Sequence, residues 1–210
     1  MQEAPPRWLA TLAGATRSSA ASALTARNFL PWIRGRIAEW SPDLIASNEG
    51  GSNQLLVRAP ARIIEVRRLT LTRRPERRRM LFARVTMPGG RELAVANVHA
   101  SSGDPVAAAR DVELGADRAV EWSGGGPLLF GGDLNVRPGH DAGLFDRLRR
   151  HLGLVPGAVP GSLDHLLARG LEVVDPPAPL PPEERDVDGP DGLKLRLSDH
   201  APVVGSFGME

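Results

Sequence analysis

Four short strings carry the side chains best suited to chemistry, and each joins aspartate, asparagine or histidine to a short apolar run. They are Asn97-Val98-His99, Gly131-Gly132-Asp133-Leu134-Asn135, Leu163-Asp164-His165 and Ser198-Asp199-His200. Carboxylate and carboxamide oxygens are hard ligands that suit Mg²⁺ or Mn²⁺. A histidine can act as a general acid or stabilise developing negative charge. Gathered in one pocket, these groups supply what metal-assisted hydrolysis of a phosphate ester requires.

The elements around these strings are predicted to bring them to one edge of a sheet. Residues 93–98 are nearly continuously apolar, which is typical of a buried strand, and residues 127–130 form a second short apolar strand. The clearest helix runs from Asp104 to Trp122, because Asp104 suits the N-cap and Pro105 suits the first turn. Strands that end at one edge gather their polar ends, so we expect the four strings to converge.

Periodicity and turn signals predict the remaining elements. Strand-like runs cover residues 54–58, 63–72, 79–87, 92–100, 163–167, 171–174 and 201–207, with a hairpin turn at 88–91. Further helices are expected at 5–15, at 144–152 and within 24–43, whereas residues 174–191 form a Pro-, Asp- and Glu-rich loop. This alternation indicates sheets covered by helices.

The four strings resemble the signatures of a known superfamily of endonucleases, exonucleases and phosphatases. Residues 131–135 and the run Leu-Ser-Asp-His-Ala-Pro-Val at 197–203 are similar to two of its motifs, and residues 97–100 resemble its histidine strand. Residues 163–165 resemble the Asp-bearing strand between the last two motifs, and the order and spacing match. The resemblance implies one domain over residues 1–210, an α/β four-layer sandwich of two packed, mainly antiparallel β-sheets flanked by helices, deoxyribonuclease-like.

The resemblance also assigns catalytic roles position by position. Asp133 would activate or position the attacking water, with Asn135 beside it contacting the phosphate. His200 would face the scissile phosphate, oriented by Asp164, and His99 would be a second imidazole donor. The assignment agrees with general chemistry, because a catalytic histidine needs a carboxylate to fix its tautomer and support its cation.

The metal ligands that the resemblance implies are Glu3 and Asp199, which would hold Mg²⁺ or Mn²⁺. The family normally begins with a strand carrying an asparagine, and a second strand follows that ends in Gln-Glu. Gln2 and Glu3 resemble the end of that second strand, so we expect the first strand to be absent. Loss of a central strand would expose backbone groups on its neighbours and weaken the core.

Composition excludes several other classes of function. The 210 residues contain no cysteine, so disulfides, thiolate metal sites and cysteine nucleophiles are excluded. No apolar run approaches the roughly 20 residues of a transmembrane helix. Residues 1–10 lack the apolar stretch of a secretory signal, so we expect a cytoplasmic location. Protein partners stay unknown at this stage.

Positive charge is concentrated in one segment, since residues 58–84 hold ten arginines and only two glutamates. Such a stripe can bind phosphates, and it can equally be a solvated strand face. The same two alternatives stay open for the run 73–79. It can bind phosphate groups, or it can be a solvated connection within a hairpin. Asn53 is a substrate-side candidate because its loop can approach the pocket, although it can also only form a turn.

We therefore predict a divalent-metal-dependent hydrolase of phosphate esters, a phosphodiesterase or nuclease-like enzyme rather than a monoesterase. Its substrate stays open between nucleic acid, phospholipid and a small phosphodiester, because one fold serves many substrates. The alternative is a catalytically impaired remnant that binds phosphate or nucleic acid. The open N-terminus favours that alternative, and the retained site residues oppose it. His165 is interpreted as a structural histidine.

Overall fold

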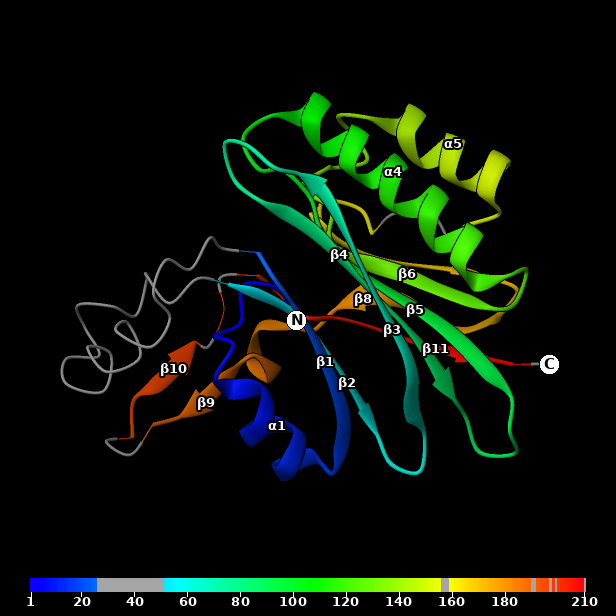
Figure 1. The fold of residues 1–210 in the computed structure, drawn as a ribbon. Coiled ribbons are helices and arrows are strands. Elements are labelled where there is room, and N and C mark those ends of the chain that lie inside the picture. Colours follow the sequence, from blue (N-terminus) through cyan, green and yellow to red (C-terminus); the bar gives the residue numbers. More distant parts are fainter. Residues whose placement is uncertain (26–50, 156–158, 190–191, 197, 199, 210) are drawn as a thin grey trace.

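A five-stranded sheet forms the centre of the computed structural model, which describes residues 1–25, 51–155, 159–189, 192–196, 198 and 200–209. The strand order is β3-β4-β5-β6-β7 (Figure 1). Strand β5 pairs parallel with β6, and the other neighbours in this sheet pair antiparallel. The strands are β3 (Arg62–Thr72), β4 (Arg78–Thr86), β5 (Glu92–His99), β6 (Leu128–Asp133) and β7 (Asp164–Arg169).

Two helices, α4 (Pro105–Ser123) and α5 (Ala142–Leu152), cover one face of this sheet (Figure 1). The side chain of Asp104 caps α4 by accepting hydrogen bonds from two backbone N–H groups of the first turn, as predicted. Between helices and sheet lies the main core, whose largest fully buried members are Phe82, Phe130 and Met80. The continuous apolar pattern of β5 and β6 follows from burial on both faces.

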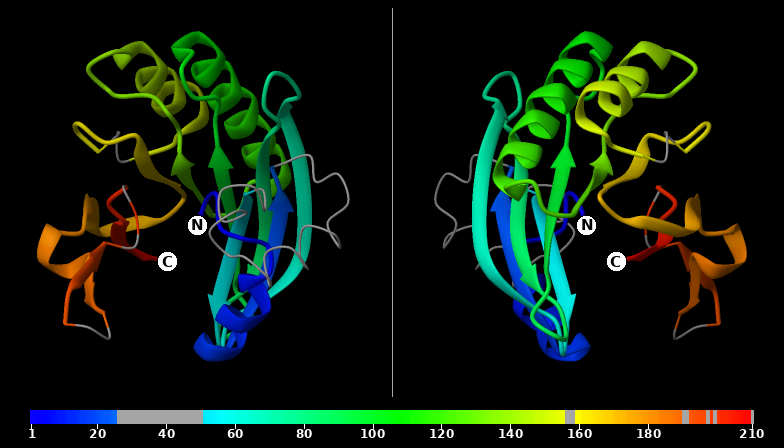
Figure 2. Two further views of the ribbon diagram at one scale, coloured as in Figure 1. Left: turned by 90° about the vertical axis from the view of Figure 1, so that its left-hand side faces the viewer. Right: turned by 90° about the vertical axis from the view of Figure 1, so that its right-hand side faces the viewer.

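The opposite face of the sheet packs against an antiparallel pair of strands, β1 (Ser18–Leu24) and β2 (Ser52–Arg58). Ala21 and Ala23 of β1 contact Leu81 of β4 in a second, smaller core. Helix α1 (Trp8–Thr16) lies against β1 on the outside. The layers confirm the predicted α/β class with mainly antiparallel sheets between helices (Figure 2).

The C-terminal part adds a separate antiparallel pair, β8 (Glu172–Pro179) with β11 (Val203–Gly208), beside β7. Figure 2 shows this pair across from β1 and β2, with the N-terminus between them. Between β8 and β11 lie a short 3₁₀ helix (Pro182–Glu184) and the paired strands β9 (Asp186–Asp188) and β10 (Lys194–Arg196). The expected loop at 174–191 is therefore partly regular structure.

Strand β1 is an element that the sequence pattern missed. A helix was expected within residues 24–43, but Leu24 lies at the end of this strand, and residues 26–43 lie outside the described residues. Ser and Ala carry little strand propensity. The strand forms because β2 supplies its hydrogen-bond partners and because its alanines fit closely against β4. None of the described helices is long and apolar enough to cross a membrane.

Two consecutive glycines let β6 approach its neighbours closely. A Cβ atom at Gly131 would lie 2.2 Å from the carbonyl oxygen of His165, and one at Gly132 would lie 2.1 Å from that of Val98. Gly132 also has a φ of 129°, which side chains rarely adopt. The Gly-Gly pair before Asp133 therefore fixes how near the three strands lie at the edge where the polar strings meet.

We predict that Gly132→Ala destabilises the protein by about 2 kcal/mol or more, because the methyl group overpacks a backbone contact and strains φ. Gly14→Ala is the matched control, since Gly14 is exposed on α1 with no atom within 4 Å of an added Cβ. The control should be neutral or stabilising by up to about 1 kcal/mol. Urea unfolding of both variants measures the difference, and equal stabilities would contradict the packing argument.

Candidate active site

The candidate site is a row of side chains at one edge of the five-stranded sheet. His99 at the end of β5 lies opposite Asp133 at the end of β6, and Asp133 lies opposite Asp164 at the start of β7. Residues directly opposite each other on paired strands present their side chains on the same face. The sequence prediction that these strings converge is therefore confirmed for the residues that the structure describes.

The loop before β11 adds His200 to this row. Its Nδ1 lies 2.6 Å from Oδ2 of Asp164, a hydrogen bond that orients the ring and fixes Nδ1 as the donor. The opposite nitrogen, Nε2, is then the atom that the ring can offer to a substrate. The structure thus brings together the predicted His200–Asp164 pair, whereas the predicted metal ligand Asp199 lies outside the described residues.

Asp133 is a buried carboxyl in an unfavourable electrostatic setting. Burial and the nearby Asp164 carboxylate raise the pKa of Asp133 to about 6, and a backbone hydrogen bond from Asn135 opposes this only in part. Two carboxyl groups that share a site cannot both ionise freely. Asp133 is therefore ionised at neutral pH but is a much stronger base than an ordinary aspartate.

Glu3 reaches the same edge from the N-terminal segment. That segment lies along β2, where Ala4 forms a bridge with Ser52, and along β5, where the buried amide of Asn97 bonds to the Met1 carbonyl and to Gln2. The Glu3 carboxylate is 73% exposed and lies 3.8 Å from Nε2 of His99. Glu3 thus lies on the solvent-exposed side of the row of site residues.

His99 is buried and has an arginine as its closest polar partner. Nη1 of Arg78, the first residue of β4, lies 2.6 Å from Nε2 of His99. Burial, the Arg78 charge and His200 lower the pKa of His99 to about 3. His99 is therefore a neutral imidazole, and its 3.6 Å approach to Asp133 is not an ion pair.

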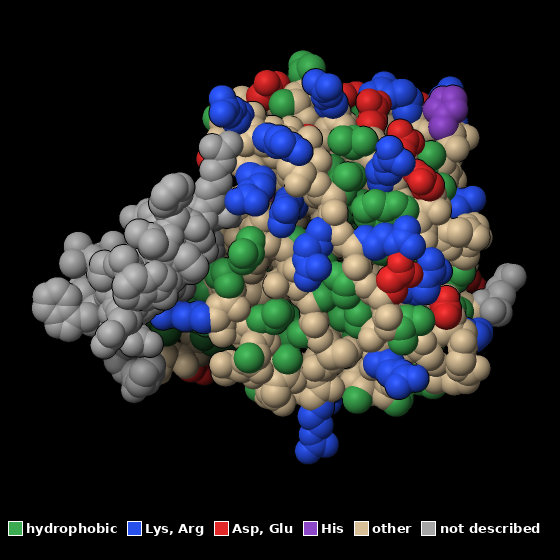
Figure 3. Space-filling model, in the orientation of Figure 1, with side chains coloured by type: hydrophobic (Ala, Val, Ile, Leu, Met, Phe, Trp, Pro, Cys, Tyr) green, Lys and Arg blue, Asp and Glu red, His purple; other side chains and the backbone are tan. Residues whose placement is uncertain are grey.

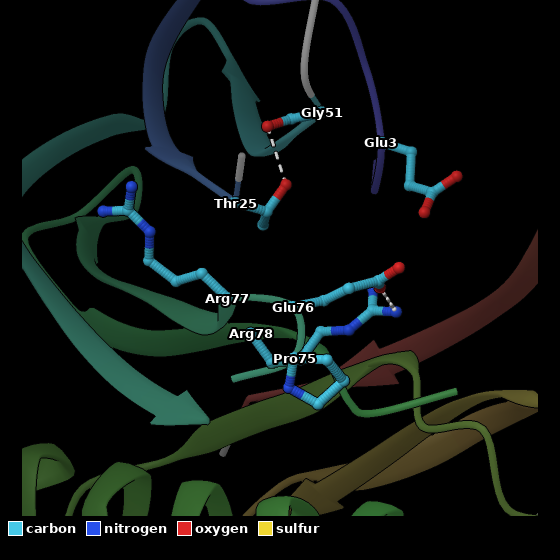
Figure 4. A pocket seen from close by; sticks show the side chains of 7 residues that line it. All are labelled: Glu3, Thr25, Gly51, Pro75, Glu76, Arg77 and Arg78. Carbon is cyan, nitrogen blue, oxygen red and sulfur yellow. Dashed lines mark hydrogen bonds and ion pairs between the residues drawn. The ribbon is translucent and has the colours of Figure 1, made fainter. Parts of the chain in front are cut away.

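Arg78 is the residue that the sequence analysis did not single out from the run 73–79. Ser102 and Glu76 accept hydrogen bonds from its other terminal nitrogen. Arg78 and Glu3 also line one cavity of about 340 Å³ that opens beside the row (Figure 4). Thr25 and Gly51 complete its upper wall in that view. The only hint in the sequence was the excess of arginines there.

One predicted residue, Asn53, has different surroundings from those expected. Asn53 is fully buried, and its Nδ2 donates to the Arg79 carbonyl at 2.6 Å, so it joins β2 to β4 and offers no surface to a substrate. Its role as a substrate-side residue is therefore corrected. Asn135 lies next to the row with a φ of 52°, and its Nδ2 donates to the Ala100 carbonyl at 3.1 Å.

His165 fits the interpretation of a structural histidine. It is buried, its Nδ1 accepts from the Val159 N–H at 2.9 Å, and its Nε2 lies 2.9 Å from the Val136 carbonyl. Burial lowers the pKa of His165, so its ring is neutral. Both ring nitrogens are occupied by these two buried contacts. The motif Leu163-Asp164-His165 therefore points one polar residue to the site and the next into the core, as strand alternation requires.

The donor set suits a hard divalent cation. One ligand atom from each of Asp133, Asp164 and His200 lies within 4.8 Å of the others, so this group could hold a metal ion. Burial and, after it, the nearby Asp164 carboxylate raise the pKa of Asp133, and a cation bound beside the carboxyl would favour its ionised form. Glu3 adds a further exposed carboxylate at the same edge. Oxygen-rich donors of this kind suit Mg²⁺ or Mn²⁺.

Comparisons with known proteins identify the class. A model of the Endonuclease/Exonuclease/phosphatase family matches residues 1–200, and the chain belongs to this family. The resemblance predicted from the motifs is thereby confirmed. Members of this family cleave phosphate esters as nucleases or phosphatases, so the chain is one of a family of phosphoesterases. A search of curated proteins found no match.

Solved structures share the fold at low sequence identity. An endonuclease/exonuclease/phosphatase family protein from Bacteroides thetaiotaomicron superposes with a TM-score of 0.61 at 14% identity, covering 92% of this chain and 95% of that one. A mannosyl-6-phosphatase from the same organism gives 0.67 at 15% identity, covering 98% and 83%. A humanised D. rerio TDP2 gives 0.61 at 15%, covering 99% and 82%. These likenesses establish the deoxyribonuclease-like fold.

We predict that Asp133→Asn stabilises the metal-free protein at neutral pH. The raised pKa means that the ionised carboxyl is disfavoured in the folded state, so the contribution of Asp133 to wild-type stability falls as pH rises from about 4 to about 6 and is then level. The stability gain of the variant should therefore grow over that range. Thermal unfolding in EDTA from pH 4 to pH 8 measures it.

Asp117→Asn is the control, because Asp117 is an exposed residue of α4. It should leave the pH dependence unchanged. Adding Mn²⁺ should stabilise the wild type more than Asp133→Asn, because a cation that binds only the folded state shifts unfolding by mass action. An Asp133→Asn protein that is less stable than wild type at every pH would contradict the electrostatic account.

Proposed function

We propose that the protein is a divalent-metal-dependent phosphodiesterase of the nuclease-like kind. The observation that carries the proposal is the row of His99, Asp133 and Asp164 with His200 bonded to Asp164 at 2.6 Å. A buried carboxylate with a raised pKa, a carboxylate-oriented imidazole and converging oxygen donors are the groups that hydrolysis of a phosphate ester needs. Membership of the family supports the same reaction class.

Each side chain has a role that follows from its surroundings. Asp133 orients the attacking water and accepts its proton, since one of its oxygens is held by the Asn135 N–H and its pKa is close to neutral. His200 presents Nε2 to the scissile phosphate while Asp164 holds Nδ1 and supports any positive charge on the ring. Asn135 places its amide beside the phosphate.

Glu3 and Asp199 are the proposed ligands of Mg²⁺ or Mn²⁺. When bound, such an ion polarises a phosphate oxygen and stabilises negative charge on the leaving oxygen. Glu3 is suited to this role because its carboxylate is exposed at the edge of the row, and Asn97 anchors the segment that carries it. Its backbone also contacts Gly51 so closely that a Cβ there would lie 2.8 Å from the Glu3 Cα.

The substrate that we propose is a nucleic acid, because uncompensated positive charge lies next to the row. Arg79 lies opposite His99 in the sheet, and its pKa is lowered by burial and by the charges of Arg77 and Arg68. In the described chain neither Arg68 nor Arg79 pairs with a carboxylate; they donate to the Ser22 carbonyl and to Thr70. Repeated phosphates are the partners that such a cluster favours.

Arginines in the half of β3 and β4 that lies further from the row have different partners. Arg67 and Arg84 both pair with Glu65, and Arg84 also approaches Glu92. Figure 3 shows this contrast on one face of the molecule, where arginines run without acidic neighbours over part of the β3 and β4 region and mix with red side chains elsewhere. Within the stripe, Arg67 and Arg84 are thus paired with carboxylates, whereas Arg68 and Arg79 donate to uncharged acceptors.

We predict Mg²⁺- or Mn²⁺-dependent turnover of bis(4-nitrophenyl) phosphate, exceeding turnover of 4-nitrophenyl phosphate. Asp133→Ala and His200→Ala should each lower kcat at least about 100-fold, because each removes a group that acts on a proton or on developing charge. The wild-type rate should fall at low pH as Asp133 becomes protonated, and a bound cation should move that fall below the pKa of about 6 of the metal-free carboxyl. EDTA should abolish turnover.

The control is His151→Ala, since His151 is exposed on α5. It should keep wild-type turnover. A purified, folded Asp133→Ala or His200→Ala protein with near wild-type kcat would remove that residue from the mechanism. A folded wild type that binds Mn²⁺ and phosphate without turnover would favour the binding-module alternative instead.

A second prediction concerns the charged cluster. The double variant Arg68→Ala/Arg79→Ala should bind a phosphodiester oligonucleotide more weakly, and the slope of log affinity against log salt should fall by about 0.7–0.9 for each lost phosphate contact. Arg67→Ala/Arg84→Ala is the control, because those charges are already paired. Fluorescence anisotropy across salt concentrations measures both. Equal slopes for both double variants would contradict a nucleic acid substrate.

A further inference from the structure

Helix α4 buries one carboxylate, that of Asp111, which is not a member of the row of site residues. Asp111 is 2% exposed. Its Oδ2 accepts two hydrogen bonds from Ser101, one from the backbone N–H at 3.0 Å and one from the hydroxyl at 2.7 Å. Its Oδ1 accepts a third bond from the Thr72 hydroxyl at 2.8 Å. Burying a carboxylate costs free energy, and an apolar side chain would serve helix packing alone, so the charge points to a further role.

Ser101 is the middle residue of a short segment, residues 100–102, that leaves the end of β5 and contacts the candidate site. The Ala100 N–H donates to the backbone carbonyl of Asp133 at 3.0 Å. The Ala100 carbonyl accepts from Nδ2 of Asn135 at 3.1 Å. The carboxylate on α4 holds the next residue along through both its N–H and its hydroxyl. The helix therefore fixes a segment that in turn bonds to two residues of the site.

The bond to Ala100 determines how the carboxamide of Asn135 is turned. A carboxamide has two N–H donors and one acceptor oxygen, whereas a backbone carbonyl can only accept, so the NH₂ group faces Ala100. The amide is planar, and the second N–H therefore has a direction that the segment 100–102 sets. The backbone of Asn135 is fixed separately, because its N–H donates to Oδ1 of Asp133 at 3.0 Å.

We propose that Asp111 is a positioning residue that acts through Ser101 and Ala100 to aim the carboxamide of Asn135 at the scissile phosphate. The purpose of this arrangement rests on the proposed function, whereas the line of contacts from α4 to Asn135 is a feature of the fold itself. Helix α4 has 19 residues and packs on the main core, so it is a rigid reference for a group that must not rotate. A donor stabilises developing charge best when its direction is fixed before the reaction.

Two substitutions at Asp111 separate its hydrogen bonds from its charge. Asp111→Ala leaves the N–H and the hydroxyl of Ser101 without their acceptor, and it should lower kcat by about 10- to 100-fold, because a small misplacement of an acting group is costly. Asp111→Asn can turn its oxygen to Ser101 and its NH₂ to the Thr72 hydroxyl, which can accept, so it can make all three contacts. It should therefore keep most of the wild-type kcat.

The matched control is Thr72→Val, which keeps the shape of the side chain and removes the bond to the other oxygen of the same carboxylate. Thr72 belongs to β3, and its bond leads away from the segment 100–102. Thr72→Val should therefore lower the temperature of unfolding, as the loss of a buried hydrogen bond does, and leave kcat unchanged. A purely structural role of Asp111 would instead give Thr72→Val and Asp111→Ala the same kind of effect.

The experiment has two readouts on the full chain. The first is kcat and KM for bis(4-nitrophenyl) phosphate with Mg²⁺, where Asp111→Ala should change kcat more than KM and should have no further effect in an Asn135→Ala background. The second is ¹H–¹⁵N NMR of the Asn135 side-chain amide in the metal-free protein, assigned from its loss in Asn135→Ala. The signal should shift, and its protons should exchange faster with solvent, in Asp111→Ala but not in Thr72→Val. Thermal unfolding checks that each variant is folded.

A milder variant keeps the test decisive if Asp111→Ala does not fold. Ser101→Ala removes only the hydroxyl bond to Asp111 and keeps the bond from the backbone N–H. It should shift the Asn135 amide signal in the same direction and lower kcat by less than the larger truncation does.

A folded Asp111→Ala protein that keeps the wild-type amide signal of Asn135 would overturn the proposal. So would equal losses of kcat in Asp111→Ala and Thr72→Val. A further loss of kcat in the Asn135→Ala background would also contradict it, because the effect would then pass through another contact of the segment, such as that of Ser102 with Arg78. A wild type that hydrolyses no phosphodiester, but whose Asn135 amide responds to Asp111→Ala as expected, would refute the proposed function and leave the positioning of Asn135 intact.

Discussion

The parallel pairing of β5 with β6 is the constraint on which the candidate site depends. It sets His99 opposite Asp133, and the antiparallel pairing of β6 with β7 then sets Asp133 opposite Asp164. Gly131 and Gly132 permit this approach, since a side chain at either would collide with a neighbouring carbonyl. A slip of one residue in the register would turn the carboxyl groups to the other face.

That register concentrates acidic groups at an edge of the sheet where burial leaves Asp133 poorly solvated. Asp133 carries the electrostatic cost, as its raised pKa indicates, while Asp164 is compensated by His200. His99 stays neutral beside Arg78, so the imidazole does not neutralise the acids. Stability is lost at such a site, and a bound ligand or cation can restore it.

The sequence by itself determined the order of the polar strings, the strands that carry them and the helix that begins after Asp104. These follow from local physical chemistry. An apolar run before Gly-Gly-Asp predicts a strand end, and an aspartate before a proline predicts a helix start. The family was also recognisable at this level, because its motifs are short and contiguous. The Arg-rich run 73–79 showed an excess of positive charge but not the direction of any side chain.

Only the tertiary structure decided which polar residues face the site and which are buried. Of three consecutive arginines, Arg78 alone is buried against His99, and Asn53 lies entirely inside, between β2 and β4. Strand β1 likewise forms from small residues because β2 and the sheet surface accept it. The physical reason is common to all three. Burial and pairing depend on the register and on which layer covers a strand, and both are set by residues distant in the sequence.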